Sequence, residues 1–152
     1  MKNVASFDLR NVELHQAAVW TENGSVAFMQ EGGFSGRVQA GSLQTVSVPS
    51  LRLRDQLADS VDFLKVDIEG AEFDVIRDCA DRLSNVDRLF IEYHSEADKP
   101  QRLDEMLAII RQAGFRYQIQ EANVARKPFL ARQTMMGMDL QLNLFCFRDT
   151  PA

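Results

Sequence analysis

The chain has 152 residues, 45% of them hydrophobic, which is enough for one globular domain covering residues 1–152. Its 17 Lys and Arg residues against 22 Asp and Glu residues give a formal net charge of -5. A nucleic-acid partner is therefore not expected, because such proteins carry a basic face. No apolar run approaches the roughly 20 residues of a membrane span, and the first residues do not lead into a signal peptide, so we expect a cytoplasmic protein without a membrane partner.

The chain contains only two cysteines, Cys79 in a helical pattern and Cys146 in a strand pattern. Neither stands at the Cys or His spacing of a metal site, so the cysteine pattern predicts no metal. We expect both to be reduced core residues.

The first fifty residues read as an irregular, strand-rich region. Residues 12–20 predict a strand or a strand pair, and Asn23 with Gly24 is a turn signal that favours a hairpin to residues 25–29. A glycine cluster follows at residues 32–36, and residues 46–48 alternate up to Pro49.

Two strand-helix units follow in the middle of the chain. Residues 51–57 predict a helix of about two turns, and the apolar run 61–68 predicts a buried strand. An acidic turn then leads into helical spacing from residue 73 to 83. A second short apolar strand at 89–94 precedes a helix that ends at Gly114. Two successive units of this kind predict an α/β fold with a parallel sheet.

The C-terminal part contains two strictly alternating segments, 115–119 and 140–147, which predict a terminal antiparallel pair. The stretch 120–139 between them exceeds the usual roughly 12 to 15 residues of a structureless loop. Its cationic and thioether side chains could line a pocket for an apolar, partly anionic molecule. The alternative is a solvated loop whose methionines cover the sheet edge. These side chains are Arg126, Lys127, Arg132, Met135, Met136 and Met138.

Four titratable residues follow the two parallel strands. Asp67 and Glu69 come after the first strand, and Glu92 and His94 end the second. Because ligands of open α/β sheets bind at the carboxyl ends of the strands, we expect these groups to share one rim and to perturb one another's pKa values. The alternative is helix capping, in which Glu69 and Glu72 accept free backbone N–H groups.

His94 is the most suggestive single residue of this rim. An imidazole with an ordinary pKa of roughly 6.5 suits a general base that takes a proton from a hydroxyl near neutral pH. An ordinary hydrogen-bonded histidine is the alternative. His15, the only other histidine, lies in a strand pattern that favours a structural role.

Residues 61–72, VDFLKVDIEGAE, closely resemble the DxxKxDxEGxE signature of the FkbM methyltransferase family. The flanking segments agree with this resemblance. Residues 51–57 look like the short helix before the signature, and residues 89–94 look like the following strand that ends in Glu-x-His. Residues 11–20 are similar to the family's third strand, which ends in an Ala-Val pair. The resemblance covers nearly the whole chain and is only weakly diagnostic after residue 120.

The resemblance implies a Rossmann-like class I methyltransferase sheet, S-adenosylmethionine as cofactor, and O-methylation of a hydroxyl on a sugar, polyketide or similar small molecule. By the same resemblance, Ala18 and Val19 would lie near the adenine of the cofactor. Asp67 would contact the cofactor and, with Glu69, stand near the methyl-transfer centre.

The acceptor side of the site is implied in the same way. Glu92 and His94 would shape the pocket of the small-molecule hydroxyl acceptor, with His94 or Asp67 as the base. Independently of the resemblance, the composition of the loop after residue 120 makes Arg126 and Met136 the predicted substrate contacts.

The sequence departs from the family pattern at its start. The family begins with a strand, a glycine-rich turn and a second strand that ends in an acidic residue, and no counterpart precedes Asn11. The glycines at 32–36 come too late and are not followed by a helix. We therefore expect an N-terminally truncated domain that binds S-adenosylmethionine weakly by itself.

The absent strands belong between the strand at residue 12 and the one at residue 63, so we expect a split sheet. A complementing N-terminal segment, repacking of the first fifty residues against residues 63–68, or a second copy would fill the gap. We favour association into a homo-oligomer. Besides methyl transfer, a catalytically inactive interaction module and a small-molecule-binding domain that uses the methionine loop remain alternative functions.

Overall fold

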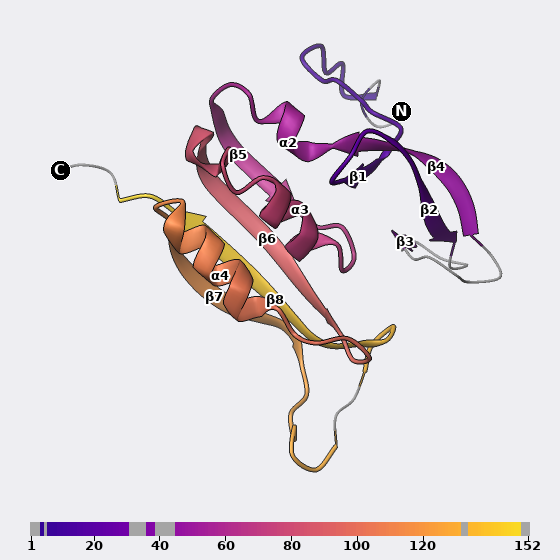
Figure 1. Cartoon of the computed structure of the whole chain (residues 1–152), viewed down its shortest axis with the longest axis vertical. Helices are drawn as coiled ribbons and strands as arrows, with labels where there is room; N and C mark the ends of the chain where they lie inside the picture. Colours follow the sequence, from indigo (N-terminus) through magenta and orange to yellow (C-terminus); the bar gives the residue numbers. More distant parts are fainter. Residues whose placement is uncertain (1–3, 5, 31–35, 39–44, 132–133, 150–152) are drawn as a thin grey trace.

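The computed structural model describes residues 4, 6–30, 36–38, 45–131 and 134–149. These residues form two four-stranded sheets, with strand orders β1-β4-β2-β3 and β5-β6-β8-β7. Figure 1 shows the first sheet at one end of the molecule and the second sheet running along its length. The mixed α/β composition expected from the sequence is confirmed, and the two sheets are separate hydrogen-bonded units.

The first sheet is built around β4, which is parallel to β1 and antiparallel to β2. The expected hairpin between residues 12–20 and 25–29 is therefore wrong, because β4 lies between the two strands. Asn23 explains the difference: its Oδ1 accepts the backbone N–H of Arg52 at 2.9 Å, which ties the turn to the end of β4. The strands are β1 (Ala18–Trp20), β2 (Gly24–Gln30), β3 (Gly36–Val38) and β4 (Thr45–Arg52).

The predicted strand around Val12 and Leu14 is also wrong. Both side chains are about half exposed and their backbone lies outside the strands of the structure. Among the described residues no strand pairs with this segment, and an extended segment without a paired strand is not stable by itself. The glycine cluster at 32–36 falls outside the described residues except for Gly36, which begins β3.

The second sheet confirms the two strand-helix units and the terminal antiparallel pair. β5 and β6 are parallel, with Leu64 opposite Leu89. β8 is antiparallel to both β6 and β7, so it lies between them and its Leu144 is opposite Ile91 on one side and Ile119 on the other. The strands are β5 (Val61–Val66), β6 (Val86–Glu96), β7 (Arg116–Val124) and β8 (Met138–Phe147).

The helices are shorter than the sequence pattern indicates. Residues 51 and 52 pair with β1 as the end of β4, so α2 (Leu53–Gln56) is a single turn and not the two expected. The next helix, α3 (Glu72–Asp78), stops at Asp78, and a 3-10 turn, η1 (Leu83–Asn85), follows. The longest helix of the described residues is α4 (Leu103–Gln112). No helix in the described parts of the chain is long and apolar enough to span a membrane.

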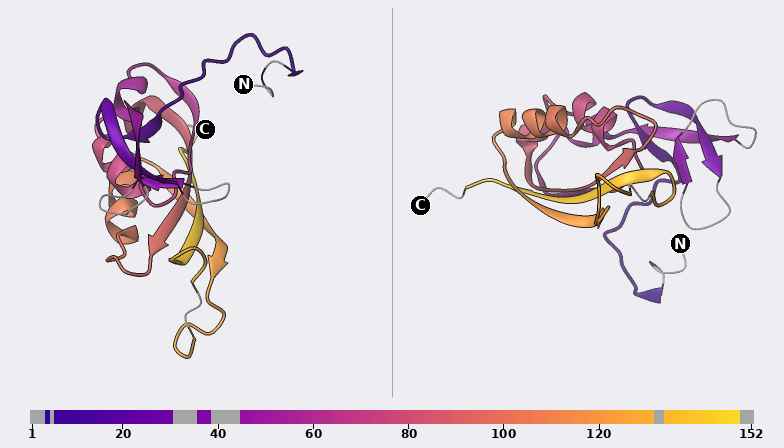
Figure 2. Two further views of the ribbon diagram at one scale, coloured as in Figure 1. Left: turned by 90° about the vertical axis from the view of Figure 1, so that its right-hand side faces the viewer. Right: turned by 90° about the horizontal axis from the view of Figure 1, so that it is seen from below.

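The core lies between the second sheet and helices α3 and α4, which cover one of its faces (Figure 2). Ile76, Ile91, Met106, Ile110 and Leu144 are fully buried there. The two cysteines are also buried in this core and are free, as expected. Val19 of β1 and Leu53 of α2 pack against the same core, so apolar contacts attach the first sheet to the second.

The other face of the second sheet carries partly exposed phenylalanines. Leu64 and Leu89 face the helices, so the residues next to them point to the opposite face. Phe63 there is 59% exposed, and Phe147 lies in the same cross-strand row. Among the described residues, β5 pairs only with β6, which leaves its outer edge open. Repacking of the first fifty residues against this edge is therefore not what the structure shows.

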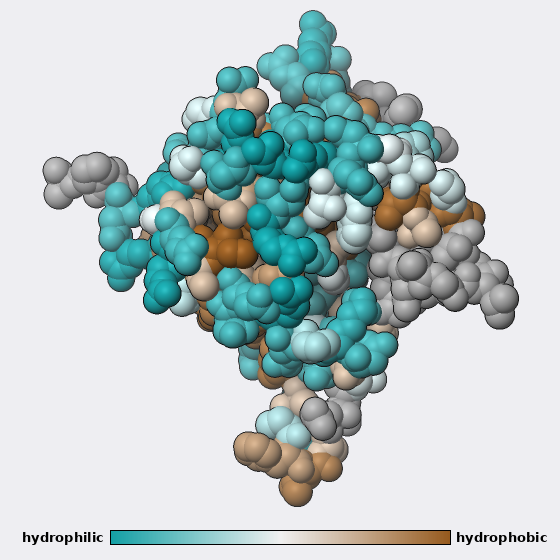
Figure 3. Space-filling model, in the orientation of Figure 1, coloured by the Kyte–Doolittle hydropathy of each residue, from teal (hydrophilic) through white to brown (hydrophobic). Residues whose placement is uncertain are grey.

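The described part of the stretch 120–139 contains regular structure, because β7 continues to Val124. A short bridge joins Lys127 to Ala131 and another joins Met135 to Met138. At the tip of the remaining loop, Phe129 and Leu130 are 99% and 85% exposed, and Figure 3 shows this hydrophobic end projecting from a largely hydrophilic surface. Arg132 lies outside the described residues.

Candidate functional site

The turn between β5 and α3 is the first component of the site. Its backbone is left-handed at Glu69, with φ 55°, and at Gly70, with φ 101°. A side chain at position 70 would be strained by this φ, and its Cβ would lie 3.2 Å from Oε1 of Glu96. Glycine is therefore required here, and the tight turn keeps Asp67 and Glu69 at the carboxyl end of β5.

Glu72 holds this turn in place. Its side chain is 1% exposed, and its carboxylate accepts the backbone N–H groups of Ile68 and Gly70 at 3.1 Å. The proposed capping function is thus partly correct for Glu72, which binds the backbone of the turn and not the first N–H groups of α3. Glu69 differs, because none of the described backbone N–H groups donates to its carboxylate.

The same carboxylate fixes His94 at the end of β6. Oε1 of Glu72 is 3.1 Å from Nδ1 of His94, and Oε2 accepts the backbone N–H of His94 at 3.4 Å. Because a carboxylate accepts, Nδ1 carries the proton in this contact and donates it to Glu72. In the neutral ring, Nε2 is then the atom with a free electron pair. Glu72 therefore orients both the turn after β5 and the end of β6, the two parts of the chain that form the rim.

The structure brings together the four rim residues that the sequence indicated. Nε2 of His94 is 3.9 Å from Oε2 of Glu69 and 3.9 Å from Oε1 of Glu92. Asp67, Glu69 and His94 offer ligand atoms that all lie within 4.8 Å of one another. Lys65 places its Nζ 2.6 Å from Oδ2 of Asp67 and partly neutralises this acidic group.

The environment of His94 has two opposing effects on its pKa. Burial of the ring lowers the pKa, whereas the hydrogen bond to Glu72 and the charges of Glu72, Glu69 and Glu92 raise it. The carboxylates outweigh burial, and the pKa of His94 lies above its ordinary value of 6.5. The ring of His94 therefore binds a proton more readily than a histidine in water.

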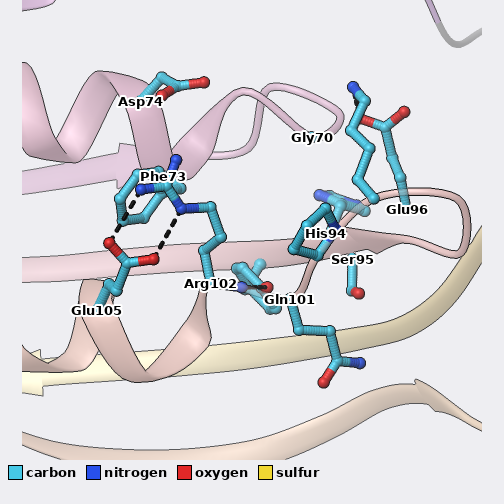
Figure 4. A pocket seen from close by; sticks show the side chains of 12 residues that line it. Gly70, Phe73, Asp74, His94, Ser95, Glu96, Gln101, Arg102 and Glu105 are labelled. Carbon is cyan, nitrogen blue, oxygen red and sulfur yellow. Dashed lines mark hydrogen bonds and ion pairs between the residues drawn. The ribbon is translucent and has the colours of Figure 1, made fainter.

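A cavity of about 390 Å³ opens beside the rim, and His94 and Gly70 form part of its wall (Figure 4). Its outer part comes from the segment between β6 and α4, which sequence reasoning did not select. There the guanidinium of Arg102 lies 3.7 Å above the ring of Phe73 and makes two 2.9 Å hydrogen bonds to Glu105. The position of this segment after β6, at the same edge of the sheet as His94, is the signal that could have identified it.

The remaining predicted site residues lie elsewhere. Ala18 lines a second cavity of about 540 Å³ together with Val48 and Pro49, whereas Val19 packs against the core. Arg126 and Met136 are exposed residues of the loop between β7 and β8, and neither lines these two cavities. Their contact with a substrate stays a prediction.

A comparison with protein-family models identifies the Methyltransferase FkbM domain at residues 5–117, more than half of the 152-residue chain. The chain belongs to the FkbM methyltransferase family. No curated protein and no solved structure matches it.

The matched part of this FkbM domain contains every element of the rim. It includes the signature turn around Gly70 and the Glu-x-His end of β6, and it also includes α4. The loop with Arg126 and Met136, and the whole of β8, lie beyond the match. Family membership therefore supports the rim more directly than it supports the loop.

Proposed function

We propose that this protein is an S-adenosylmethionine-dependent O-methyltransferase that acts on a hydroxyl of a sugar, polyketide or similar small molecule. One observation carries the proposal: the family's signature turn meets the Glu-x-His end of β6 beside a cavity of about 390 Å³. The parallel pair β5 and β6, followed by an antiparallel β8, agrees with the Rossmann-like class I sheet that the family resemblance implies.

The residues present fit two groups of the cofactor, its sulfonium and its adenine. S-adenosylmethionine carries a positive sulfonium, and the carboxylates of Asp67, Glu69 and Glu92 are each about one third exposed at the rim, where they can face a cation. The cavity at Ala18 is mainly apolar and suits an adenine ring. When bound, the cofactor supplies an electrophilic methyl group.

The rim itself would orient the acceptor. Methyl transfer requires the hydroxyl oxygen to lie in line with the methyl carbon, and fixing that geometry supplies a large part of the rate. The cofactor would supply the methyl group and its sulfur would keep the electron pair of the C–S bond, while the rim residues would hold the acceptor oxygen that takes the methyl group. The hydroxyl proton passes to a basic atom of the rim, for which Asp67 and Nε2 of His94 are the candidates named from the sequence.

The experiment is transfer of a radiolabelled methyl group from S-adenosylmethionine to a panel of hydroxylated sugars and polyketides. The cofactor is supplied at saturating concentration. We expect a methyl ether product on at least one acceptor, identified by mass spectrometry. A purified, folded protein that transfers no methyl group to any acceptor would count against the proposal.

A non-catalytic interaction module is the second candidate function. The open edge of β5 and the 59% exposed ring of Phe63 favour it, because unpaired strand edges recruit other strands. Such a module would associate with a partner without binding S-adenosylmethionine. Calorimetric titration with S-adenosylhomocysteine separates the two functions, since only the enzyme is expected to bind this product.

A further inference from the structure

Asp67, Glu69 and His94 could act together as metal ligands. The hydrogen bonds among the described residues leave some of their possible ligand atoms without a hydrogen-bond partner. Their ligand atoms lie within 4.8 Å of one another, and they come from both strand ends of the rim. Two carboxylates and one imidazole are a common ligand combination for first-row divalent metals. Carboxylates that lie close together are common on protein surfaces without a bound ion. The position of His94 among them is therefore the observation that indicates a metal site.

His94 has the orientation of a metal ligand. Its side chain is 3% exposed, and its Nδ1 is held by the buried carboxylate of Glu72. A carboxylate behind one ring nitrogen is the usual partner of a metal-bound histidine, because it fixes the tautomer and makes the other nitrogen a better ligand. Nε2, the other nitrogen, points toward the rim, and among the described residues no hydrogen bond reaches it.

The distances around Nε2 are compatible with a shared ion. The nearest carboxylate oxygens, on Glu69 and Glu92, are each 3.9 Å away, which is too far for a hydrogen bond. Adjacent ligands that lie about 2.1 Å from one octahedral ion are about 3 Å apart. A movement of about 1 Å by the partly exposed carboxylate of Glu69 closes this difference. The ligand atoms of Asp67, Glu69 and His94 all lie within 4.8 Å of one another, and two ligands on opposite sides of such an ion are about 4.2 Å apart, so Asp67 also needs only a small movement while the buried ring of His94 stays in place.

Glu72 also fixes the backbone of the turn that carries Asp67 and Glu69. By accepting the N–H groups of Ile68 and Gly70 it fixes the residues on both sides of Glu69, and by binding His94 it sets the distance between the turn and the end of β6. The ring of His94 and the backbone of the turn that carries the two carboxylates are thus fixed before any ion arrives, which lowers the entropic cost of binding. In the structure Lys65 occupies the carboxylate of Asp67 and would have to leave it.

We propose that Asp67, Glu69 and Nε2 of His94 bind a divalent first-row transition-metal ion, with Mn²⁺ as the representative of this class. Mixed carboxylate and imidazole donors suit this class better than Mg²⁺ or Ca²⁺, which prefer oxygen alone. The positions that the protein leaves open would be filled by water or by a hydroxyl oxygen.

The role of the ion rests on the proposed function. A hydroxyl bound to a divalent cation loses its proton more easily and is held in a fixed direction, which are the two requirements of methyl transfer to oxygen. Asp67 and His94 would then be ligands and not bases, and Glu92, with its oxygen 3.9 Å from Nε2, would accept the proton. The ion is neither oxidised nor reduced in this step.

Mn²⁺ binding to the protein alone, without cofactor or acceptor, tests the site. Loss of the free Mn²⁺ signal in electron paramagnetic resonance gives the affinity of the wild type and of Asp67→Asn and Glu69→Gln, whose side chains are partly exposed. We expect one saturable site and a loss of at least about tenfold in each variant. Lys65→Met should bind Mn²⁺ more tightly than the wild type, because it removes the competing cation from Asp67.

The chain provides its own spectroscopic control, since His15 is the only other histidine. Substoichiometric Mn²⁺ should broaden the ring proton resonances of His94 before those of His15, which a His15→Gln variant assigns. Glu121→Gln, an exposed change on β7, should leave the affinity unchanged. Absence of saturable binding at millimolar Mn²⁺, or equal affinity in the wild type, Asp67→Asn and Glu69→Gln, would overturn the proposal.

These measurements test the metal site and the methyltransferase activity independently of each other. Intact Mn²⁺ binding in a protein that never transfers a methyl group would count only against the methyltransferase activity. Methyl transfer that proceeds in the presence of chelator, by a protein without a saturable Mn²⁺ site, would count only against the metal.

Discussion

Glu72 determines the geometry of the rim more than any other residue. Its carboxylate is almost completely buried and receives three backbone N–H groups and one ring N–H. A buried carboxylate is stable only when its acceptor sites are used in this way. The turn after β5 and the end of β6 are therefore joined through one side chain, although they are far apart in the sequence.

Glu72→Ala should lower the free energy of unfolding, because the N–H groups of Ile68, Gly70 and His94 lose their acceptor in a buried site. Each unsatisfied donor costs about 1–3 kcal/mol, and water entering the cavity offsets part of this cost. Urea denaturation followed by circular dichroism measures the change. The exposed variant Glu121→Gln is the control, and equal stability of Glu72→Ala and the wild type would show that these bonds contribute nothing.

The sequence predicted the members of the rim but not what holds them. Asp67, Glu69, Glu92 and His94 could be grouped because the carboxyl ends of parallel strands meet at one edge of a sheet. The segment after β6 could have been assigned to the same edge, but the place of Arg102 over the ring of Phe73 could not be predicted, since it depends on how α4 packs against α3. Residues in connecting segments are positioned by such tertiary contacts, which leave no local pattern.

At the scale of elements, an ion pair supplements the apolar contacts between the first sheet and the helices of the second. Arg52, the last residue of β4, donates from Nε and Nη2 to the carboxylate of Asp78 at the end of α3, at 2.9 and 2.7 Å. Two parallel bonds of this kind are the strongest form of a surface ion pair. The hydrogen bond from Arg52 holds the pKa of Asp78 below its ordinary value of 3.8.

Asp78→Asn should therefore be less stable than the wild type at neutral pH. Because the pKa of Asp78 is lower in the folded than in the unfolded state, its contribution is present above the unfolded pKa and is lost as the pH falls through the folded pKa. The difference in urea midpoint between the two proteins should shrink as the pH falls below about 4. Asp74→Asn, a substitution at a more exposed position on the same helix, should change the urea midpoint less. If the difference between Asp78→Asn and the wild type does not depend on pH, the ion pair of Asp78 with Arg52 is not its cause.

The elements themselves were predictable to different degrees. The second sheet followed from local patterns, since the apolar run of β5 and the alternation in β7 and β8 are each visible in a few residues. The first sheet did not, because the pairing of β1 and β2 with β4 depends on contacts such as Asn23 with Arg52, which lie 29 positions apart. Turn signals in the sequence indicate where the chain reverses direction, but they do not indicate which strands will pair with each other.

At the scale of the whole molecule, the open edge of β5 predicts association. Among the described residues no strand pairs with this edge, so a strand from another chain could pair with its N–H and C=O groups beside the exposed ring of Phe63. Light scattering over a dilution series should show more than a monomer at micromolar concentration. Phe63→Lys should shift the protein toward the monomer, because a charge on an edge strand opposes pairing. A wild type that stays monodisperse and monomeric would refute this prediction.

The most direct measurement of the central claim, that the rim between β5 and β6 is the methyl-transfer site, compares turnover by Asp67→Asn with turnover by Glu121→Gln on the same acceptor. Asp67 is partly exposed, and its pairing with Lys65 is a surface contact worth little to stability, so the variant should melt within a few degrees of the wild type. We expect Asp67→Asn to lose methyl transfer while Glu121→Gln retains it. Full turnover by a folded Asp67→Asn protein would contradict the claim.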